Sequence, residues 1–198
     1  MGSKLSYYMK ILLGIIMSIL LYGVVVYAQS DALGHEKWEY VLEDSGDILQ
    51  IAIPVSAGLI TLLKEDYKGT KSLALSYGTT LALSYTFKHI TKLKRPEGRN
   101  RFDSFPSAHT SSAFSGASFL QRRYGWNYGW PAYLLATIVA VSRTEGPDGY
   151  HTVWDVLGGA AMGIGSTYLF TKPYENPKLE FGLSVNRSSR ILTIRYIL

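Results

Sequence analysis

Residues that could carry out chemistry lie in three short clusters, each at the edge of an apolar run. In chain order the clusters contain Lys88 and Arg95; Ser107, Ala108 and His109; and Arg143, His151 and Asp155. A polar side chain in such a place can be held firmly and still meet water. Phosphoryl transfer through a protein nucleophile requires cations and N–H groups around the anion, a nucleophile in line, and an acid for the leaving oxygen. The three clusters together offer these groups.

The third cluster contains a candidate nucleophile. His151 and Asp155 are spaced i, i+4, which puts both side chains on one face of a helix. A carboxylate that accepts from one ring nitrogen fixes the tautomer and leaves the lone pair of the other nitrogen free to attack. His109 is then the natural proton donor to the leaving oxygen. Thr152-Val-Trp-Asp155 also fits a capping box, in which Asp155 would only cap its helix, and the sequence leaves both interpretations open.

The other two clusters favour the binding of an anion. Pro96 biases Arg95 away from helical geometry, so this arginine is expected in a loop that can reach inward. Ser107 follows a proline and is expected to begin a helix. The first N–H groups of that helix, those of Ala108 and His109, would form an anion site.

A metal site built from the same residues is the competing interpretation. Two imidazoles and a carboxylate, from His109, His151 and Asp155, are a donor set that can hold zinc. The cationic side chains of the three clusters would meet in the same pocket, where they would repel a dication and attract an anion. We therefore expect neither a metal nor another cofactor.

The composition limits the kinds of site and partner. The 198 residues contain no cysteine, which excludes disulfides and thiolate metal ligands. The formal net charge is +5 and the pI is near 9.3, but the basic residues lie in short loops between apolar runs rather than on one polar face. This distribution fits membrane flanks and an anion pocket better than a nucleic-acid surface. We expect no nucleic-acid partner.

Five apolar runs predict the helices that must position the clusters. They cover residues 48–63, 72–90, 107–120, 126–142 and 153–170. Small residues within them, such as Gly159 and Gly163 four positions apart, suit a close approach of helices. The predicted fold is all-α, a bundle of five to six mostly membrane-spanning helices, and a compact soluble helical core is the alternative. Alternating apolar and polar residues on either side of residues 186–189 predict a short C-terminal β-hairpin.

The chain divides into four parts. Residues 1–28, with a basic start and a long apolar stretch, are expected to be a signal peptide or a signal anchor. The other parts are an extracytoplasmic connecting segment at 29–47, the helical domain at 48–172 and a tail at 173–198. The positive-inside rule places the short basic loops at 64–71 and 121–125 in the cytoplasm, and therefore places the ends that bear the three clusters outside.

Three motifs in this order give a resemblance to a known family. Lys88-x6-Arg95-Pro96, Pro106-Ser107-Ala108-His109 and Ser142-Arg143 followed by His151-x3-Asp155 resemble the motifs of the type 2 phosphatidic acid phosphatase superfamily. That superfamily includes bacterial membrane lipid phosphatases, soluble periplasmic acid phosphatases and vanadium haloperoxidases. The resemblance covers roughly residues 48–170 and implies the helical core that these proteins share.

The resemblance also implies the part that each residue plays. The enzyme would be a metal-free phosphatase in which His151 becomes a phosphohistidine, Asp155 orients His151, and His109 is the general acid. By motif position, the phosphate would be bound by Lys88, Arg95, Ser107, the backbone of Ala108, and Arg143.

Two departures from the family's pattern bear on these implications. The family usually has glycine at the position of Ala108, and alanine adds a methyl group and loses access to positive φ. The family also usually places five residues between the arginine and the nucleophilic histidine, whereas seven separate Arg143 from His151 here. The Gly-Pro-Asp-Gly stretch within those seven can absorb the extra residues as a turn.

The resemblance implies a phosphatase of the bacterial cytoplasmic (inner) membrane with its active site on the periplasmic face. Its substrate would be a lipid phosphomonoester or diphosphate, with phosphatidylglycerol phosphate, undecaprenyl diphosphate, phosphatidic acid and lipid A phosphates as candidates. One alternative is a soluble periplasmic acid phosphatase of broad specificity. The other is a catalytically silent membrane protein that binds phosphate or lipid.

Overall fold

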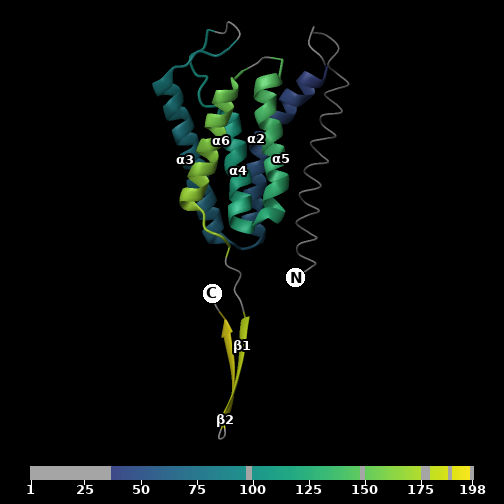
Figure 1. The fold of residues 1–198 in the computed structure, drawn as a ribbon, viewed down its shortest axis with the longest axis vertical. Coiled ribbons are helices and arrows are strands. Elements are labelled where there is room, and N and C mark those ends of the chain that lie inside the picture. The colour runs from purple at the N-terminus through teal and green to yellow at the C-terminus, as the bar shows by residue number, and fades with distance from the viewer. Residues whose placement is uncertain (1–36, 97–99, 148–149, 175–178, 187–188, 197–198) are drawn as a thin grey trace.

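The computed structural model describes residues 37–96, 100–147, 150–174, 179–186 and 189–196, so the predicted signal segment at 1–28 lies outside the described residues. The helices in this part of the chain are α2 (Lys37–Leu63), α3 (Tyr67–Thr91), α4 (Ala108–Tyr124), α5 (Trp126–Glu145) and α6 (Val153–Phe170). They form one bundle in which consecutive helices run in opposite directions (Figure 1). Each apolar run gives one of these helices, so the predicted helical bundle is confirmed. Since α2 begins at Lys37, the boundary expected after residue 47 falls inside a helix.

Side-chain caps fix where two of the helices begin. Ser107 caps α4 by accepting a hydrogen bond from the backbone N–H of Thr110. Thr152 caps α6 in a capping box, in which the side chain of Asp155 accepts in turn from the Thr152 N–H. Because both caps lie next to candidate site residues, the interactions that begin these helices also place the site.

The helix α4 lies at the centre of the bundle, where it contacts α2, α3, α5 and α6. Its buried side chains are mostly small, among them Ala113, Ser115, Ala117 and Ser118. On α6, a Cβ at Gly159 would lie 2.5 Å from the Ser107 carbonyl oxygen, and one at Gly163 would lie 2.5 Å from that of Ser111. The two helices therefore meet backbone to backbone, as the glycine spacing predicts.

Hydroxyl groups link α3, α4 and α6 across this packed interior. The hydroxyls of Ser84 and Ser111 are 2.8 Å apart. Thr80 donates to the Ser115 hydroxyl at 3.3 Å, and that hydroxyl lies 3.4 Å from the hydroxyl of Thr167. The interior is therefore held by polar contacts as well as by the close packing of small side chains.

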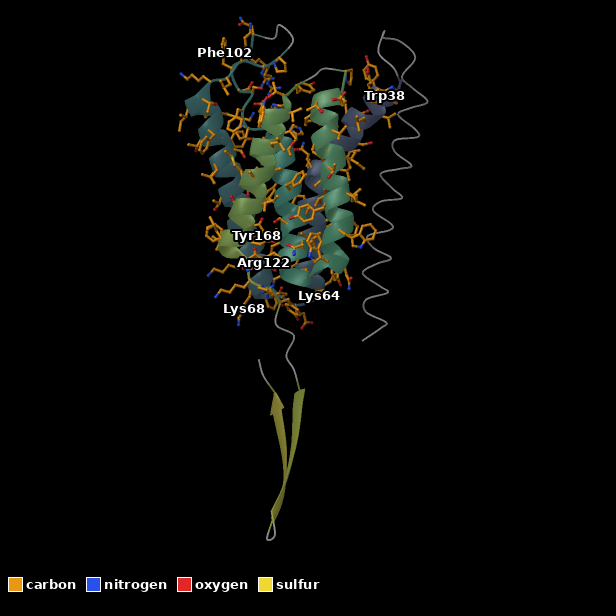
Figure 2. The ribbon with its side chains drawn as sticks, viewed as in Figure 1. Trp38, Lys64, Lys68, Phe102, Arg122 and Tyr168 are labelled. Carbon is orange, nitrogen blue, oxygen red and sulfur yellow. The ribbon has the colours of Figure 1, made fainter. Side chains whose placement is uncertain are left out.

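Large apolar side chains cover the outside of the bundle. Exposed examples are Ile51, Val55, Leu59 and Leu62 on α2; Leu75, Leu83 and Phe87 on α3; Leu134, Ile138 and Val141 on α5; and Leu157, Leu169 and Phe170 on α6. Among the described helices, the segment Trp38–Leu63 is long and apolar enough to cross a membrane by length and composition. Figure 2 shows Lys64, Lys68 and Arg122 at one end of the bundle and Phe102 at the other.

A buried ion pair holds the basic end of the bundle together. Arg123 Nε donates to Asp66 Oδ2 at 2.7 Å, and Arg123 Nη1 donates to the carbonyl oxygens of Lys172 and Pro173 at 2.9 and 3.1 Å. These bonds join the turn between α2 and α3, the end of α4 and the segment after α6. They anchor the helices at the end opposite the three clusters.

A two-stranded hairpin follows the bundle. The strands β1 (Leu179–Asn186) and β2 (Ser189–Tyr196) pair antiparallel, with Leu179 opposite Tyr196 and Asn186 opposite Ser189. Figure 1 shows the hairpin extending from the end of the bundle where α6 finishes. It contains none of the candidate site residues.

Replacing Gly163 with alanine should destabilise the bundle by about 1–3 kcal/mol, the usual cost of overpacking a core. The added Cβ would lie 2.5 Å from the Ser111 carbonyl oxygen and 2.8 Å from the Ser115 nitrogen, which are backbone atoms that cannot turn aside. Gly165→Ala is the matched control, because a Cβ at Gly165 meets nothing within 4 Å. Thermal unfolding in detergent should show a lower Tm for the first variant alone, and an equal loss in both would contradict the close approach of α4 and α6.

Candidate active site

The three clusters meet at one end of the bundle. Lys88 lies in the last turn of α3, His109 in the first turn of α4, Arg143 in the last turn of α5, and Asp155 in the first turn of α6. Because consecutive helices alternate in direction, the ends of α3 and α5 lie at the same end of the bundle as the starts of α4 and α6 (Figure 1). The fold therefore gathers side chains that are far apart in the sequence.

Asp155 forms the capping box, and it also lies close to the His151 ring without a hydrogen bond to it. Its Oδ2 atom accepts from the Thr152 N–H at 2.8 Å and from the Ser104 hydroxyl at 2.7 Å, so the capping box is present. The same oxygen lies 3.8 Å from Nδ1 of His151. This separation is longer than a hydrogen bond, and a shift of about 1 Å would close it to the range of a charge-assisted one. The hydrogen bonds from Thr152 and Ser104 therefore hold the Asp155 carboxylate near the ring of His151.

His151 is tied directly to Arg143. The His151 backbone N–H donates to the Arg143 carbonyl oxygen at 3.1 Å, so the longer loop between the two residues still returns His151 to the arginine. Burial lowers the pKa of His151, and the positive charges of Lys88 and Arg95 lower it further, while Asp155 opposes the shift. The net pKa is below the ordinary value, which keeps the imidazole neutral, with an available lone pair, at neutral pH.

The guanidinium of Arg143 is locked by its surroundings. Its side chain is 3% exposed, and Nη1 lies 2.9 Å from Asp47 Oδ1. Nε donates to the Ser142 hydroxyl at 3.1 Å, and Nη2 donates to the Glu43 carbonyl oxygen at 3.0 Å. Gly46 permits this packing, because a Cβ there would collide with the Ser142 side chain and lie 3.0 Å from Arg143 Nη2. The first three turns of α2 thus provide much of the surroundings of the Arg143 guanidinium.

Asp103 organises the other two cations. Arg95 forms a fork to its carboxylate, with Nε donating at 2.8 Å and Nη2 at 3.1 Å, and Lys88 Nζ donates to its carbonyl oxygen. Burial raises the pKa of Asp103, but the hydrogen bonds and charge of Arg95 outweigh that effect and hold it below its usual value. A guanidinium has five N–H donors, so the fork leaves Arg95 with donors for a further anion.

Tyr150 lies between two of the arginines. Its ring centroid is 5.6 Å from the guanidinium carbon of Arg95 and 5.6 Å from that of Arg143. Cations at this distance from an aromatic face are attracted to it. Tyr150, which directly precedes His151, therefore brings both arginines to the candidate nucleophile.

The start of α4 is fixed to the start of α6. Ser107 is fully buried, its N–H donates to the Asp155 carbonyl oxygen at 2.9 Å, and its hydroxyl accepts from the Thr110 hydroxyl at 3.0 Å. Ala108 is the first residue of α4. The described non-glycine residues with positive φ are Glu65 and Lys92, so the position of Ala108 does not call for glycine. Alanine leaves the backbone of this turn unstrained.

His109 shares one carboxylate oxygen with Arg143. Its Nε2 lies 3.4 Å from Asp47 Oδ1, the same atom that pairs with Arg143 Nη1. The His109 side chain is 34% exposed, which leaves it open to solvent or to a ligand. The two residues therefore lie on either side of a single acidic group.

Sequence reasoning missed the residues that hold the predicted ones in place, namely Glu43, Asp47, Asp103, Ser104 and Tyr150. Two of them had a local signal: Ser104 is three residues from Ser107, and Tyr150 directly precedes His151. Asp47 had none, because it precedes the first apolar run and its partners are far along the chain. Its contribution is visible only in the fold.

Residues 69–177 match the model of the PAP2 superfamily. The lipid A 4'-phosphatase of Helicobacter pylori is 32% identical over 177 residues, which cover 84% of this chain and 86% of that protein. The lipid A 1-phosphatase of Porphyromonas gingivalis is 35% identical over 95 residues, or 46% of this chain and 20% of that protein. The crystal structure of Aquifex aeolicus LpxE has the same fold, with a TM-score of 0.59 and 19% identity, covering 74% of this chain and 92% of that one.

Proposed function

The chain belongs to the PAP2 superfamily of phosphoric ester hydrolases, and we propose that it releases phosphate from a lipid through a phosphohistidine at His151. The observation that carries the proposal is the 3.1 Å hydrogen bond from the His151 N–H to the Arg143 carbonyl oxygen. This hydrogen bond holds His151 beside Arg143, whose guanidinium is suited to binding phosphate. Asp47 contacts both His109 and Arg143. The proposed general acid, His109, therefore lies near the same arginine as the nucleophile.

In the first step the cations bind the non-bridging oxygens of the phosphoryl group, and Nε2 of His151 attacks phosphorus. The new P–N bond forms as the bond from phosphorus to the leaving oxygen breaks, and His109 gives that oxygen a proton. Lys88, Arg95 and Arg143 stabilise the charge on the equatorial oxygens. Asp155, facing Nδ1, stabilises the positive charge that the His151 ring acquires.

In the second step water attacks the phosphohistidine. His109, now neutral, takes a proton from the water, the P–N bond breaks and inorganic phosphate leaves. The same residue thus acts first as acid and then as base, as microscopic reversibility requires of a double displacement.

The cations of the site replace what a metal ion would otherwise supply. Charge stabilisation comes from fixed guanidinium and ammonium groups, and the nucleophile is an imidazole rather than a metal-bound hydroxide. Within the described residues, no three His, Cys, Asp or Glu side chains are grouped so that they could hold one metal ion. This arrangement supports a metal-independent reaction.

Embedding in a bilayer is supported by the distribution of side chains. Large apolar residues such as Val55, Leu83 and Ile138 are exposed on the outside of the bundle, while Ser84, Ser111 and Thr167 are buried within it. Interhelical hydrogen bonds between small residues are typical of helices packed in lipid. The basic end with Lys64, Lys68 and Arg122 would face the cytoplasm, and the site would then open on the periplasmic face of the inner membrane.

A phosphate ester of lipid A is the substrate class that we favour. The two curated relatives are named for the 4'- and 1-phosphates of lipid A, and the relation to the first spans most of both chains. Phosphatidylglycerol phosphate, phosphatidic acid and undecaprenyl diphosphate are the other candidates that the sequence motifs admit.

A phosphate-release assay over this panel of lipids, together with a water-soluble monoester, tests the proposed function. Wild-type protein in detergent should hydrolyse at least one lipid phosphate and keep its activity in EDTA. Activity abolished by EDTA would contradict the metal-free pocket, and activity confined to the soluble ester would favour a soluble periplasmic enzyme. An absence of release from every compound would favour a silent binding protein.

A further inference from the structure

We propose that Asp47 positions the general acid, by holding His109 with Nε2 toward its carboxylate and Nδ1 free for the leaving oxygen. This inference rests on the proposed function and adds to the reaction a residue outside the region, residues 69–177, that matches the family model. Asp47 would not touch the reacting atoms, so its role is to place and support the groups that do.

The geometry shows why this one side chain can serve two groups. Asp47 Oδ1 lies 2.9 Å from Arg143 Nη1 and 3.4 Å from His109 Nε2. The preceding residue is Gly46, whose missing Cβ lets α2 pack directly on Ser142. That close packing of α2 on α5 brings the carboxylate within reach of both partners.

The charges around His109 call for an acidic neighbour. The charged groups that act on it are Arg143 from α5, Lys88 from α3 and Asp47 from α2, while His151 in the loop before α6 is a neutral neighbour. Of these Asp47 is the one acid. A protonated imidazole is needed at the moment the leaving oxygen departs, and it would otherwise stand among positive charges. The Asp47 carboxylate supplies the counter-charge for that imidazolium.

In each of the two histidines, one ring nitrogen then faces a carboxylate and the other is left for the reaction. Asp155 faces Nδ1 of His151, which leaves Nε2 to attack phosphorus. Asp47 faces Nε2 of His109, which leaves the Nδ1–H to protonate the leaving oxygen. A carboxylate behind an imidazole fixes its tautomer and its orientation, so each catalytic ring has a carboxylate of its own.

The test is the dependence of the rate on the leaving group in Asp47→Asn. Two amphiphilic phosphomonoesters with the same alkyl tail are compared in detergent micelles, one an alkyl ester and the other a 4-nitrophenyl ester. An alkoxide must be protonated as it leaves, whereas a nitrophenolate need not be. We expect kcat/KM to fall about 30-fold or more for the alkyl ester, a part of the roughly 10²- to 10⁴-fold that general acid catalysis contributes, and about threefold or less for the aryl ester.

The comparison separates the two partners of Asp47. Any loss that acts through Arg143 lowers both rates alike, because both esters present the same phosphate, and only the loss through His109 depends on the leaving group. Asp44→Asn is the matched control, since it removes the same charge one turn earlier on α2 and should leave the ratio of the two rates unchanged. In a His109→Gln background, Asp47→Asn should also leave that ratio unchanged.

Equal losses for both esters, or an increase in rate with either, would overturn the inference. So would a further selective loss of the alkyl ester in the His109→Gln background. None of these results would bear on the proposed phosphohistidine at His151, which is tested separately by trapping label on wild-type protein. The failure of this inference is therefore distinguishable from the failure of the proposed function.

Discussion

His151→Asn should lower kcat/KM for the lipid phosphate by about 10⁴-fold or more, because loss of a covalent nucleophile can cost roughly 10⁶-fold in kcat. Asparagine keeps the backbone N–H that donates to the Arg143 carbonyl oxygen, and it fits the space of the buried ring. The variant should therefore fold and bind phosphate while lacking the nitrogen that forms the P–N bond. Rates of phosphate release in detergent micelles, set beside thermal unfolding, measure both properties.

His89→Asn provides the matched control for this variant. His89 is exposed in the last turn of α3, and the proposed reaction gives it no part, so its substitution should change the rate less than threefold. If His151→Asn retained a tenth or more of the wild-type activity, another group or water would have to be the nucleophile.

Arg143→Lys should lower kcat/KM by about 10²- to 10³-fold, the effect of losing one donor set for a developing anion. The guanidinium reaches Ser142, the Glu43 carbonyl oxygen and Asp47 at once. An ammonium has three donors without the planar fork, so a lysine cannot keep these partners and also bind phosphate in two places. Steady-state kinetics should show a raised KM together with a lowered kcat.

Arg101→Lys makes the same chemical change at the same end of the molecule. Arg101 is 63% exposed and pairs with Asp103 at 2.9 Å, and its replacement should alter kcat/KM by less than threefold. Comparable losses in the two variants would show that the rate responds to any arginine-to-lysine change at this end of the molecule rather than to the contacts of Arg143.

The helices could be predicted because each requires only local information. The apolar runs predicted the five helices of the described chain, and the spacing of Gly159 and Gly163 predicted the close approach of α6 to a neighbouring helix. The first apolar run begins only at residue 48, because residues 37–47 are mostly polar, whereas α2 begins at Lys37. In the structure this part of α2 packs against α5 through Gly46, a contact that the sequence does not predict.

The sequence predicts the candidate site residues but not the residues that hold them in place. The spacing of His151 and Asp155 suggested one helical face, but His151 lies in the loop before α6, outside the helix. The two side chains are still close, with 3.8 Å between His151 Nδ1 and Asp155 Oδ2. The pairing of Asp47 with Arg143 joins two helices that are far apart in the sequence. The spacing of residues in the sequence cannot predict such a contact. The same is true of the ion pair between Arg95 and Asp103, which depends on the conformation of the loop between α3 and α4.

The two departures from the family's pattern are accommodated by local geometry. Ala108 begins α4, where alanine is well tolerated, so the lost access to positive φ has no consequence at this position. The longer loop after Arg143 returns through the hydrogen bond of His151, and Tyr150 within it lies against both Arg95 and Arg143. The longer loop is therefore compatible with a His151 that stays close to both arginines.

Rapid acid-free quenching of wild-type protein with ³²P-labelled lipid phosphate tests the central claim most directly. The account predicts label that is stable in alkali, labile in acid, and located by peptide mass spectrometry on His151. It also predicts that the label is absent from His151→Asn. Label on another residue, or turnover with no labelled protein at any time point, would contradict it.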